Sequence, residues 1–310
     1  MYAADMSNPS IVAVQAARLR CPAWLLLSIA VAIVLADILL TVRLWRAIAA
    51  QVAAGTAGLG AWGHMVSTMI FNFLVYAPLA AVAVLGCRTE GRRLWPEDGR
   101  PVLNGGVGLA LGAGGFAVAL GLAALAGVVA PGHESVAGAP ALMAVTGGVL
   151  VLGFQSAAEE IFFRGWLQPV LCARWGAWPG LIATTFAFSA LHLVSGARGQ
   201  LALVNIFAGG LVFGLLALRS GGLWAPIMAH FGWNWLEACG LGLEPNPGIG
   251  QTGALLNLDL AGPRLWSGGP DNMNGSVAVT LVLIALALGL LVLPPIRTAA
   301  PALRRSGSAP

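Results

Sequence analysis

Three ionisable side chains, Glu159, Glu160 and Arg164, lie within six residues, and apolar sequence flanks them on both sides. Glu160 and Arg164 are four residues apart, so on a helix they share a face and can form an ion pair. Glu159 is rotated from Glu160 by about 100° on a helix and points elsewhere. The pattern therefore predicts that Arg164 neutralises Glu160 and that Glu159 is left free to act as a general base.

Two further apolar stretches carry polar side chains at helical spacing. His192 is four residues after Phe188, and Asn234 is four residues after His230. Polar groups that face lipid are costly, so such side chains are expected to converge inside a helix bundle. Taken singly, each has a plain explanation, because a membrane histidine often serves only packing and a Glu–Arg pair can be a structural clasp. The combination on three separate stretches favours a functional site.

The turn expected at Trp175–Gly176 relates two of these stretches. Glu159 and His192 each lie sixteen residues from it along the chain. If the turn joins two antiparallel helices, the two side chains are expected to meet at one depth in the bundle.

The composition places this site in a membrane. Of the 310 residues, 58% are hydrophobic and 9% are charged, and the mean hydropathy is +0.84. Soluble domains carry roughly 25% charged residues. We therefore expect an all-α fold, a polytopic membrane bundle of about eight transmembrane helices. The expected spans are residues 22–42, 64–86, 104–130, 139–174, 177–195, 200–218, 222–243 and 276–295.

The whole chain is expected to form one membrane domain, residues 21–295, with the motifs inside 140–242 and with tails at 1–20 and 296–310. The apolar run at 139–174 is longer than a bilayer requires, so this helix must project from the membrane or break. Gly108 and Gly112, at GxxxG spacing, predict a close helix contact. The Gly/Pro/Asn-rich segment 244–275 is expected to be a loop.

The basic residues indicate topology rather than a partner. The net charge is +4 and every basic residue is an arginine, scattered at the ends of apolar runs, so no nucleic-acid partner is expected. Eleven arginines fall on the side of the N-terminus and four on the other, which predicts cytoplasmic termini. The composition, rich in Ala, Gly and Arg without Lys, suggests a bacterial inner membrane. The four cysteines are far apart and predict neither a disulfide framework nor a metal cluster.

Together the motifs Glu159-Glu160-x-x-x-Arg164, Phe188-x-x-x-His192 and His230-x-x-x-Asn234 resemble those of a known family. This is the CAAX prenyl protease and bacteriocin-processing family, the Abi-type intramembrane endopeptidases. The resemblance covers residues 140–242, and its eight spans agree with the expected count.

By this resemblance Glu159 would activate a water molecule that His192 binds and orients. His230 and Asn234 would donate hydrogen bonds to the oxyanion, and Glu160 and Arg164 would support the site. The implied substrate is a membrane-associated peptide or protein.

The family's chemistry has been interpreted both with and without a divalent metal such as zinc. We favour the metal-free version with no cofactor, because asparagine is a poor zinc ligand and HExxH is absent: His133-Glu134 is followed by Ala137. Aspartyl GxGD and serine G-x-S-x-G motifs also fail. The alternative from another class is a non-proteolytic membrane scaffold or a proton-coupled transporter that uses the buried Glu/His cluster. Neither the substrate nor the oligomeric state is predicted by the sequence.

Overall fold

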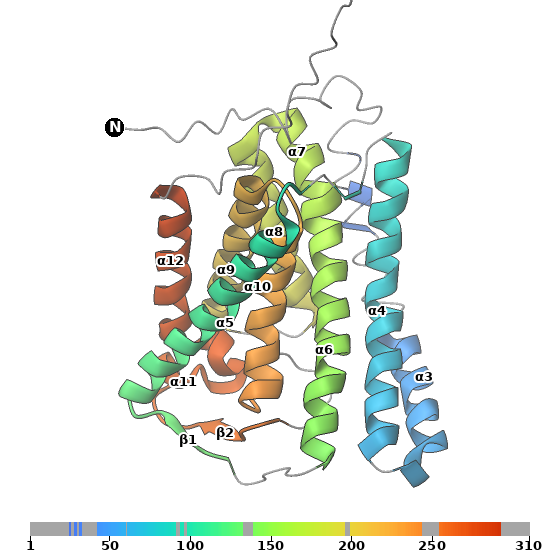
Figure 1. Cartoon of the computed structure of the whole chain (residues 1–310), viewed down its shortest axis with the longest axis vertical. Coiled ribbons are helices and arrows are strands. Elements are labelled where there is room, and N and C mark those ends of the chain that lie inside the picture. Colours follow the sequence, from blue (N-terminus) through green and yellow to red (C-terminus); the bar gives the residue numbers. More distant parts are fainter. Residues whose placement is uncertain are drawn as a thin grey trace, which may run out of the picture.

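A computed structural model gives a helical bundle in which most helices run along the long axis and α5 crosses them obliquely (Figure 1). It describes residues 25, 28, 29, 31, 32, 42–59, 61–90, 94–95, 98–132, 139–195, 199–243 and 254–292. The expected tails at 1–20 and 296–310 lie outside these residues. Most of the first expected span, 22–42, also lies outside them. For the described chain, the expected all-α fold is confirmed.

The described helical segments include four in which the chain leaves α-helical geometry: η4 and η5 are π-helical, and η3 and η6 are 3-10 helices. The elements are α3 (Val42–Gly55), η3 (Ala57–Leu59), α4 (Ala61–Thr89), α5 (Pro101–Leu125), β1 (Val129–Pro131), α6 (Ala139–Glu160), η4 (Ile161–Leu167), α7 (Gln168–Trp175), α8 (Ala177–Ser195), α9 (Gln200–Ser220), α10 (Trp224–Trp235), η5 (Leu236–Gly240), β2 (Leu258–Leu260), α11 (Arg264–Ser267), η6 (Gly269–Gly275) and α12 (Val277–Val292).

Within the described residues, five helices are long and apolar enough to cross a membrane, and they match five of the expected spans. Helix α8 is apolar but shorter, and α10 with η5 occupies the expected span at 222–243. The polytopic architecture is therefore confirmed, and the count of eight stays a prediction. The five are Met65–Thr89, Pro101–Leu125, Ala141–Trp175, Gln200–Ser220 and Gly269–Val292.

Two expected boundaries were wrong. The span expected at 104–130 ends at Leu125, where Gly127, with φ 74°, lets the chain turn before β1 begins. Strand β1 pairs antiparallel with β2, with Val129 opposite Leu260. The second wrong expectation concerns 244–275, which was expected to be a loop. Its described part contains β2, α11 and η6. Main-chain hydrogen bonding, which hydropathy does not report, gives this segment its order.

Helix α10 is held against α5 through small residues. A Cβ atom at Gly108 would overlap the main chain of Ala225, and one at Gly112 would overlap that of Ala229. Bare glycine faces of this kind let helix backbones approach closely in membranes. His230 directly follows Ala229, so this contact fixes the position of the histidine.

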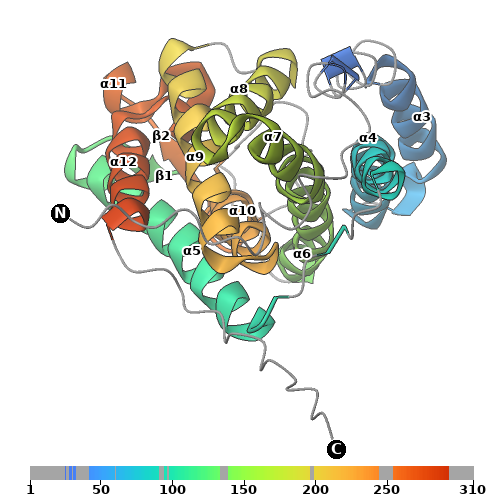
Figure 2. The ribbon, with the colours of Figure 1, turned by 90° about the horizontal axis from the view of Figure 1, so that it is seen from above.

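The apolar core has two parts. One joins α5, α9, α10 and α12 around Phe116 and Trp233, and the other joins α4, η4, α7 and α8 around Phe163 and Phe188. Seen from above, α4 and α12 lie on opposite sides of the bundle, with α6 to α10 between them (Figure 2). The polar motif residues lie on these central helices.

Candidate active site

Both glutamates end helix α6, and the helix changes type directly after them. The next seven residues form π-helical η4, which contains Arg164. Pro169, one turn later, has no N–H for the helical ladder, which favours a departure from α geometry in the preceding turn. The run to Trp175 spans 35 residues, longer than the roughly 30 Å of a hydrocarbon core. Of the two expected outcomes, the structure shows no break: the helix continues through a widened turn, of a kind frequent at functional sites.

An ion pair joins Glu160 and Arg164, as their spacing predicts. Arg164 Nη1 donates to Glu160 Oε1 over 2.8 Å, and both side chains are fully buried. The same oxygen lies 2.9 Å from His230 Nδ1 on α10. Glu160 therefore links two of the three motifs through one carboxylate oxygen. The sequence did not predict this contact.

Arg164 contacts a main-chain carbonyl and aromatic rings in addition to Glu160. Its Nη2 donates to the carbonyl of Gly210 on α9 over 2.9 Å, and its guanidinium lies 4.5 Å from the ring centre of Phe188. A second arginine–aromatic contact reaches Phe213 at 5.6 Å. Aromatic faces attract a buried cation, so the charge is balanced by rings as well as by Glu160. This environment fits the supporting role expected for Arg164.

Glu159 has a different environment from its neighbour. Only 2% of the residue is exposed, and its Oε1 accepts a hydrogen bond of 3.3 Å from Gln155, one turn earlier on α6. Its Oε2 is buried and accepts no hydrogen bond from the residues that the structure describes. His192 lies near enough to interact with it electrostatically. The two side chains expected to meet at one depth thus lie within electrostatic range of each other.

His192 is oriented by its own helix. Its Nδ1 lies 3.0 Å from the carbonyl oxygen of Phe188, and because a carbonyl only accepts, Nδ1–H is the donor. In the neutral ring, Nε2 is then an acceptor. Gly176, with φ 91°, makes the turn between α7 and α8 that brings this helix back along the motif helix.

A pocket of about 60 Å³ collects the other motif side chains. His192, His230 and Asn234 line it, whereas Glu159 and Glu160 do not; His230 both lines the pocket and contacts Glu160. The complete lining is Phe188, His192, Asn205, Ile206, Gly209, Phe213, His230, Trp233, Asn234, Asn274, Val279 and Leu283.

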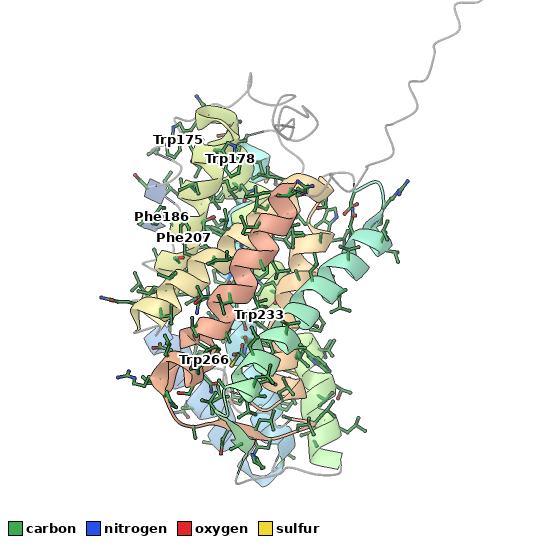
Figure 3. The ribbon with its side chains drawn as sticks, turned by 90° about the vertical axis from the view of Figure 1, so that its left-hand side faces the viewer. Trp175, Trp178, Phe186, Phe207, Trp233 and Trp266 are labelled. Atoms are coloured by element: carbon green, nitrogen blue, oxygen red, sulfur yellow. The ribbon has the colours of Figure 1, made fainter. Side chains whose placement is uncertain are left out.

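The pocket lies at mid-height of the bundle. Figure 3 shows Trp233, one of its lining residues, between Trp175 and Trp178 at one end and Trp266 toward the other. Half-exposed tryptophans such as Trp175 and Trp178 are typical of a membrane–water interface. The pocket therefore lies away from this end of the bundle, toward its middle.

His230 and Asn234 present different hydrogen-bonding capacity to this pocket. The His230 ring stacks on Phe213, with centroids 4.8 Å apart and planes 18° apart, and its Nδ1 faces Glu160. Asn234 makes no hydrogen bond to another described residue through its side chain, although only 8% of the residue is exposed. An amide held dry in a pocket retains its donors for a ligand.

Sequence reasoning missed three residues. Asn205 and Asn274 line the pocket, and Gln155 donates to Glu159. A lone asparagine in the apolar run of α9 and a glutamine four residues before Glu159 were visible signals. Asn274 gave no such signal, because it lies in a polar segment.

The donor set gives no ready metal site. Within the described ranges, no three His, Cys, Asp or Glu side chains lie together as a metal would require. Glu160 Oε1 already faces Arg164 and His230. No step below is derived through a metal, and the choice between metal-dependent and metal-free chemistry stays a prediction.

With this geometry in view, comparison with known families is informative. Residues 140–236, about a third of the chain, match the family model Rce1-like, described as "Type II CAAX prenyl endopeptidase Rce1-like". The central segment is similar to this family. It contains the six residues of the predicted site, and the resemblance inferred from the motifs is confirmed for this segment.

Comparison with individual proteins gives a shorter match. A protein of Escherichia coli named "Uncharacterized 24.3 kDa protein" is 37% identical over 87 residues, which make up 27% of this chain and 37% of that protein. The chain thus covers well under half of the length of this relative. No solved structure matches the chain. The Rce1-like segment leaves out η6 and α12, which close the pocket on its far side.

Proposed function

We propose that this protein is an intramembrane endopeptidase that hydrolyses a peptide bond in a membrane-associated peptide or protein. One observation carries the proposal: His192, His230 and Asn234, from two helices distant in sequence, line one pocket beside two buried glutamates. The Rce1-like match of residues 140–236 supports it, because that family is described as an endopeptidase.

Glu159 is the proposed general base. Its Oε2 takes a proton from a water molecule, and the water oxygen attacks the carbonyl carbon of the scissile bond. The free state of this oxygen supports the role, because no described residue donates to it. Neutral His192 orients the water through Nε2, since its Nδ1–H is occupied by the Phe188 carbonyl.

Asn234 and His230 are the proposed donors to the oxyanion. The Asn234 amide is available, but His230 Nδ1 faces Glu160, so Nε2 donates only when the ring is an imidazolium. When the carbon–nitrogen bond breaks, protonated Glu159 returns its proton to the leaving amine. Preorganised donors in a dry site contribute about 3–4 kcal/mol to such a step.

The protein is proposed to act in a bacterial inner membrane, with both termini in the cytoplasm. The arginine distribution, eleven against four, supports this orientation. Reporter fusions at each terminus that are active only in the cytoplasm test it, and silence of both fusions would contradict it.

The central experiment uses the full chain purified into liposomes. Two probes are offered: a farnesylated CAAX-type peptide, and a pool of single-span peptides read by mass spectrometry. Cleavage of either by the wild type and its loss in Glu159→Gln, with the fold retained by circular dichroism, supports the proposal. If the wild type cuts neither probe, or if Glu159→Gln cuts as fast as the wild type, the proposed chemistry is wrong.

Glu237→Gln is the matched control. Glu237 is as buried as Glu159, at 1% exposure, but lies in η5 and does not line the pocket. It separates the loss of a specific base from the loss of any buried carboxylate, and we expect it to retain cleavage. Exhaustive chelation of the wild type tests the metal-free mechanism, because lost activity that zinc restores would contradict it.

A further inference from the structure

The pocket has a second wall that none of the motifs supplies. Asn274 belongs to η6, and Val279 and Leu283 belong to α12, all outside the Rce1-like segment 140–236. They face the pocket together with Asn205 on α9. We call the part formed by η6 and the first two turns of α12 the far wall. The far wall therefore lies in the C-terminal part of the chain, outside the matched segment.

Asn205 anchors the far wall. Its Nδ2 donates to the carbonyls of Asn274 and Ser276 over 2.8 and 2.9 Å, and its Oδ1 accepts from Thr280 Oγ1 over 2.7 Å. These bonds use both donors and the acceptor oxygen of a side chain that is 2% exposed. One amide thus joins α9 to the junction between η6 and α12.

The backbone of η6 is held in an unusual conformation at the same place. Asn272 has φ 52° and ψ −146°, a region in which residues other than glycine are rare. Its Oδ1 accepts from the N–H of Met273, a residue with 0% exposure. Surroundings that over-determine a conformation of this kind keep it in place. The fixed turn presents Asn274 to the pocket in one position.

The chemistry of the pocket differs from side to side. The motif side offers His192, His230 and Asn234, whereas the other side offers Val279 and Leu283. A volume of about 60 Å³, at roughly 10–15 Å³ for each water molecule, has room for a few water molecules or for one small side chain. A prenyl chain does not fit. A peptide bond held at the polar side would place its neighbouring side chain against the apolar side.

We propose that the far wall, anchored by Asn205, is a specificity subsite that takes one small side chain, of the size of alanine, serine or cysteine, next to the scissile bond. The inference rests on the proposed endopeptidase function and adds the substrate feature that the site selects. It assigns selection to residues outside the segment that carries the chemistry.

The test compares two leucines on one helix. Leu283 and Leu290 are both buried in α12, at 4% and 9% exposure, but only Leu283 lines the pocket. The probe is a pool of single-span peptides in liposomes with Gly, Ala, Val, Leu or Phe at each central position, and mass spectrometry counts the residues beside each cut. We expect wild-type cuts beside Gly and Ala. Leu283→Ala should raise cutting beside Val or Leu about tenfold or more, because one methylene decides rates to that extent.

Val279→Leu is the opposite change, since it narrows the subsite. It should favour glycine over alanine about tenfold relative to the wild type, and Leu290→Ala should keep the wild-type preference. Thermal unfolding in detergent establishes that each variant is folded. If the wild type cuts beside large residues or cuts only the farnesylated peptide, or if Leu283→Ala and Val279→Leu keep its preference, the inference is overturned while the endopeptidase stands. If the wild type cuts none of the pool or the farnesylated peptide, the proposed function fails and takes the inference with it.

Discussion

The two walls of the pocket are held together by different forces. On the motif side, one carboxylate oxygen of Glu160 contacts both Arg164 and His230, and aromatic rings surround the guanidinium. On the far wall, Asn205 and Thr280 use neutral amide and hydroxyl hydrogen bonds. The first wall depends on buried charge and the second on uncharged polar contacts.

This difference has an energetic consequence. Removing one partner of a buried ion pair leaves an uncompensated charge and costs about 3–5 kcal/mol. A neutral hydrogen bond contributes only about 0.5–1.5 kcal/mol net. Substitutions on the motif side are therefore expected to cost much stability, in keeping with its proposed role in stabilising the transition state. Substitutions on the far wall are expected to cost little stability, in keeping with its proposed role in selecting substrates.

The largest expected effect is a loss of stability when the buried ion pair on the motif side is removed. Glu160→Ala should lower the free energy of unfolding by about 3–5 kcal/mol, because Arg164 stays buried without its carboxylate. Denaturant unfolding in detergent measures it. Glu237→Ala removes an equally buried carboxylate that has no ion pair with a described residue, and it should cost far less. Equal losses in the two variants would show that Glu160 is only one buried group among others.

The second prediction concerns rate rather than stability. Asn234→Ala should lower kcat about 10²–10³-fold by removing an oxyanion donor, with the fold kept. Peptide cleavage and thermal unfolding measure the two quantities. Asn104→Ala is the control, since Asn104 is also buried but donates to Asp98 away from the pocket. A rate that falls no further for Asn234→Ala than for Asn104→Ala would remove Asn234 from the proposed mechanism.

The third prediction acts through the helix contact behind His230. Gly112→Ala places a Cβ atom into the main chain of Ala229, so we expect a loss of about 1–3 kcal/mol in stability from overpacking. Cleavage should fall as well, because His230 moves with α10. At Gly114, two residues along, an added Cβ meets no described atom within 4 Å. Gly114→Ala should therefore leave stability unchanged or raise it, and a similar loss there would refute the close-contact explanation.

The sequence predicted those contacts of the site that leave a spacing pattern along one helix, and not those between distant helices. Glu160 and Arg164 were paired correctly because i,i+4 spacing fixes a face on one helix. The contact from Glu160 to His230 was not predicted, because helical spacing says nothing about which carboxylate faces a helix seventy residues later. The ion pair of Glu160 with Arg164 was thus predictable from the sequence, and the contact of Glu160 with His230 was not.

The far wall was beyond sequence reasoning for a related reason. The polar, Gly- and Pro-rich composition of 244–275 indicates turns but not where they pack. Asn274 reaches the pocket only because Asn205 binds the main chain of η6. A contact that depends on main-chain carbonyls leaves no residue pattern. The all-α fold was readable because long apolar runs indicate membrane-spanning helices, whereas the end of α5 at Leu125 was not.

The smallest expected effect tests the neutral wall. Thr280→Val keeps the shape of the side chain but removes the hydroxyl that donates to Asn205 Oδ1, so we expect a loss of about 1 kcal/mol in unfolding free energy. Thr184→Val is the control, because its hydroxyl bonds only a carbonyl of its own helix, that of Gly180. In the peptide pool, Thr280→Val should weaken the preference for small residues with little change in the total rate, since the oxyanion donors are untouched. A large fall in total rate with the preference intact would mean that the far wall supports the chemistry, and the distinction between the two walls would fail.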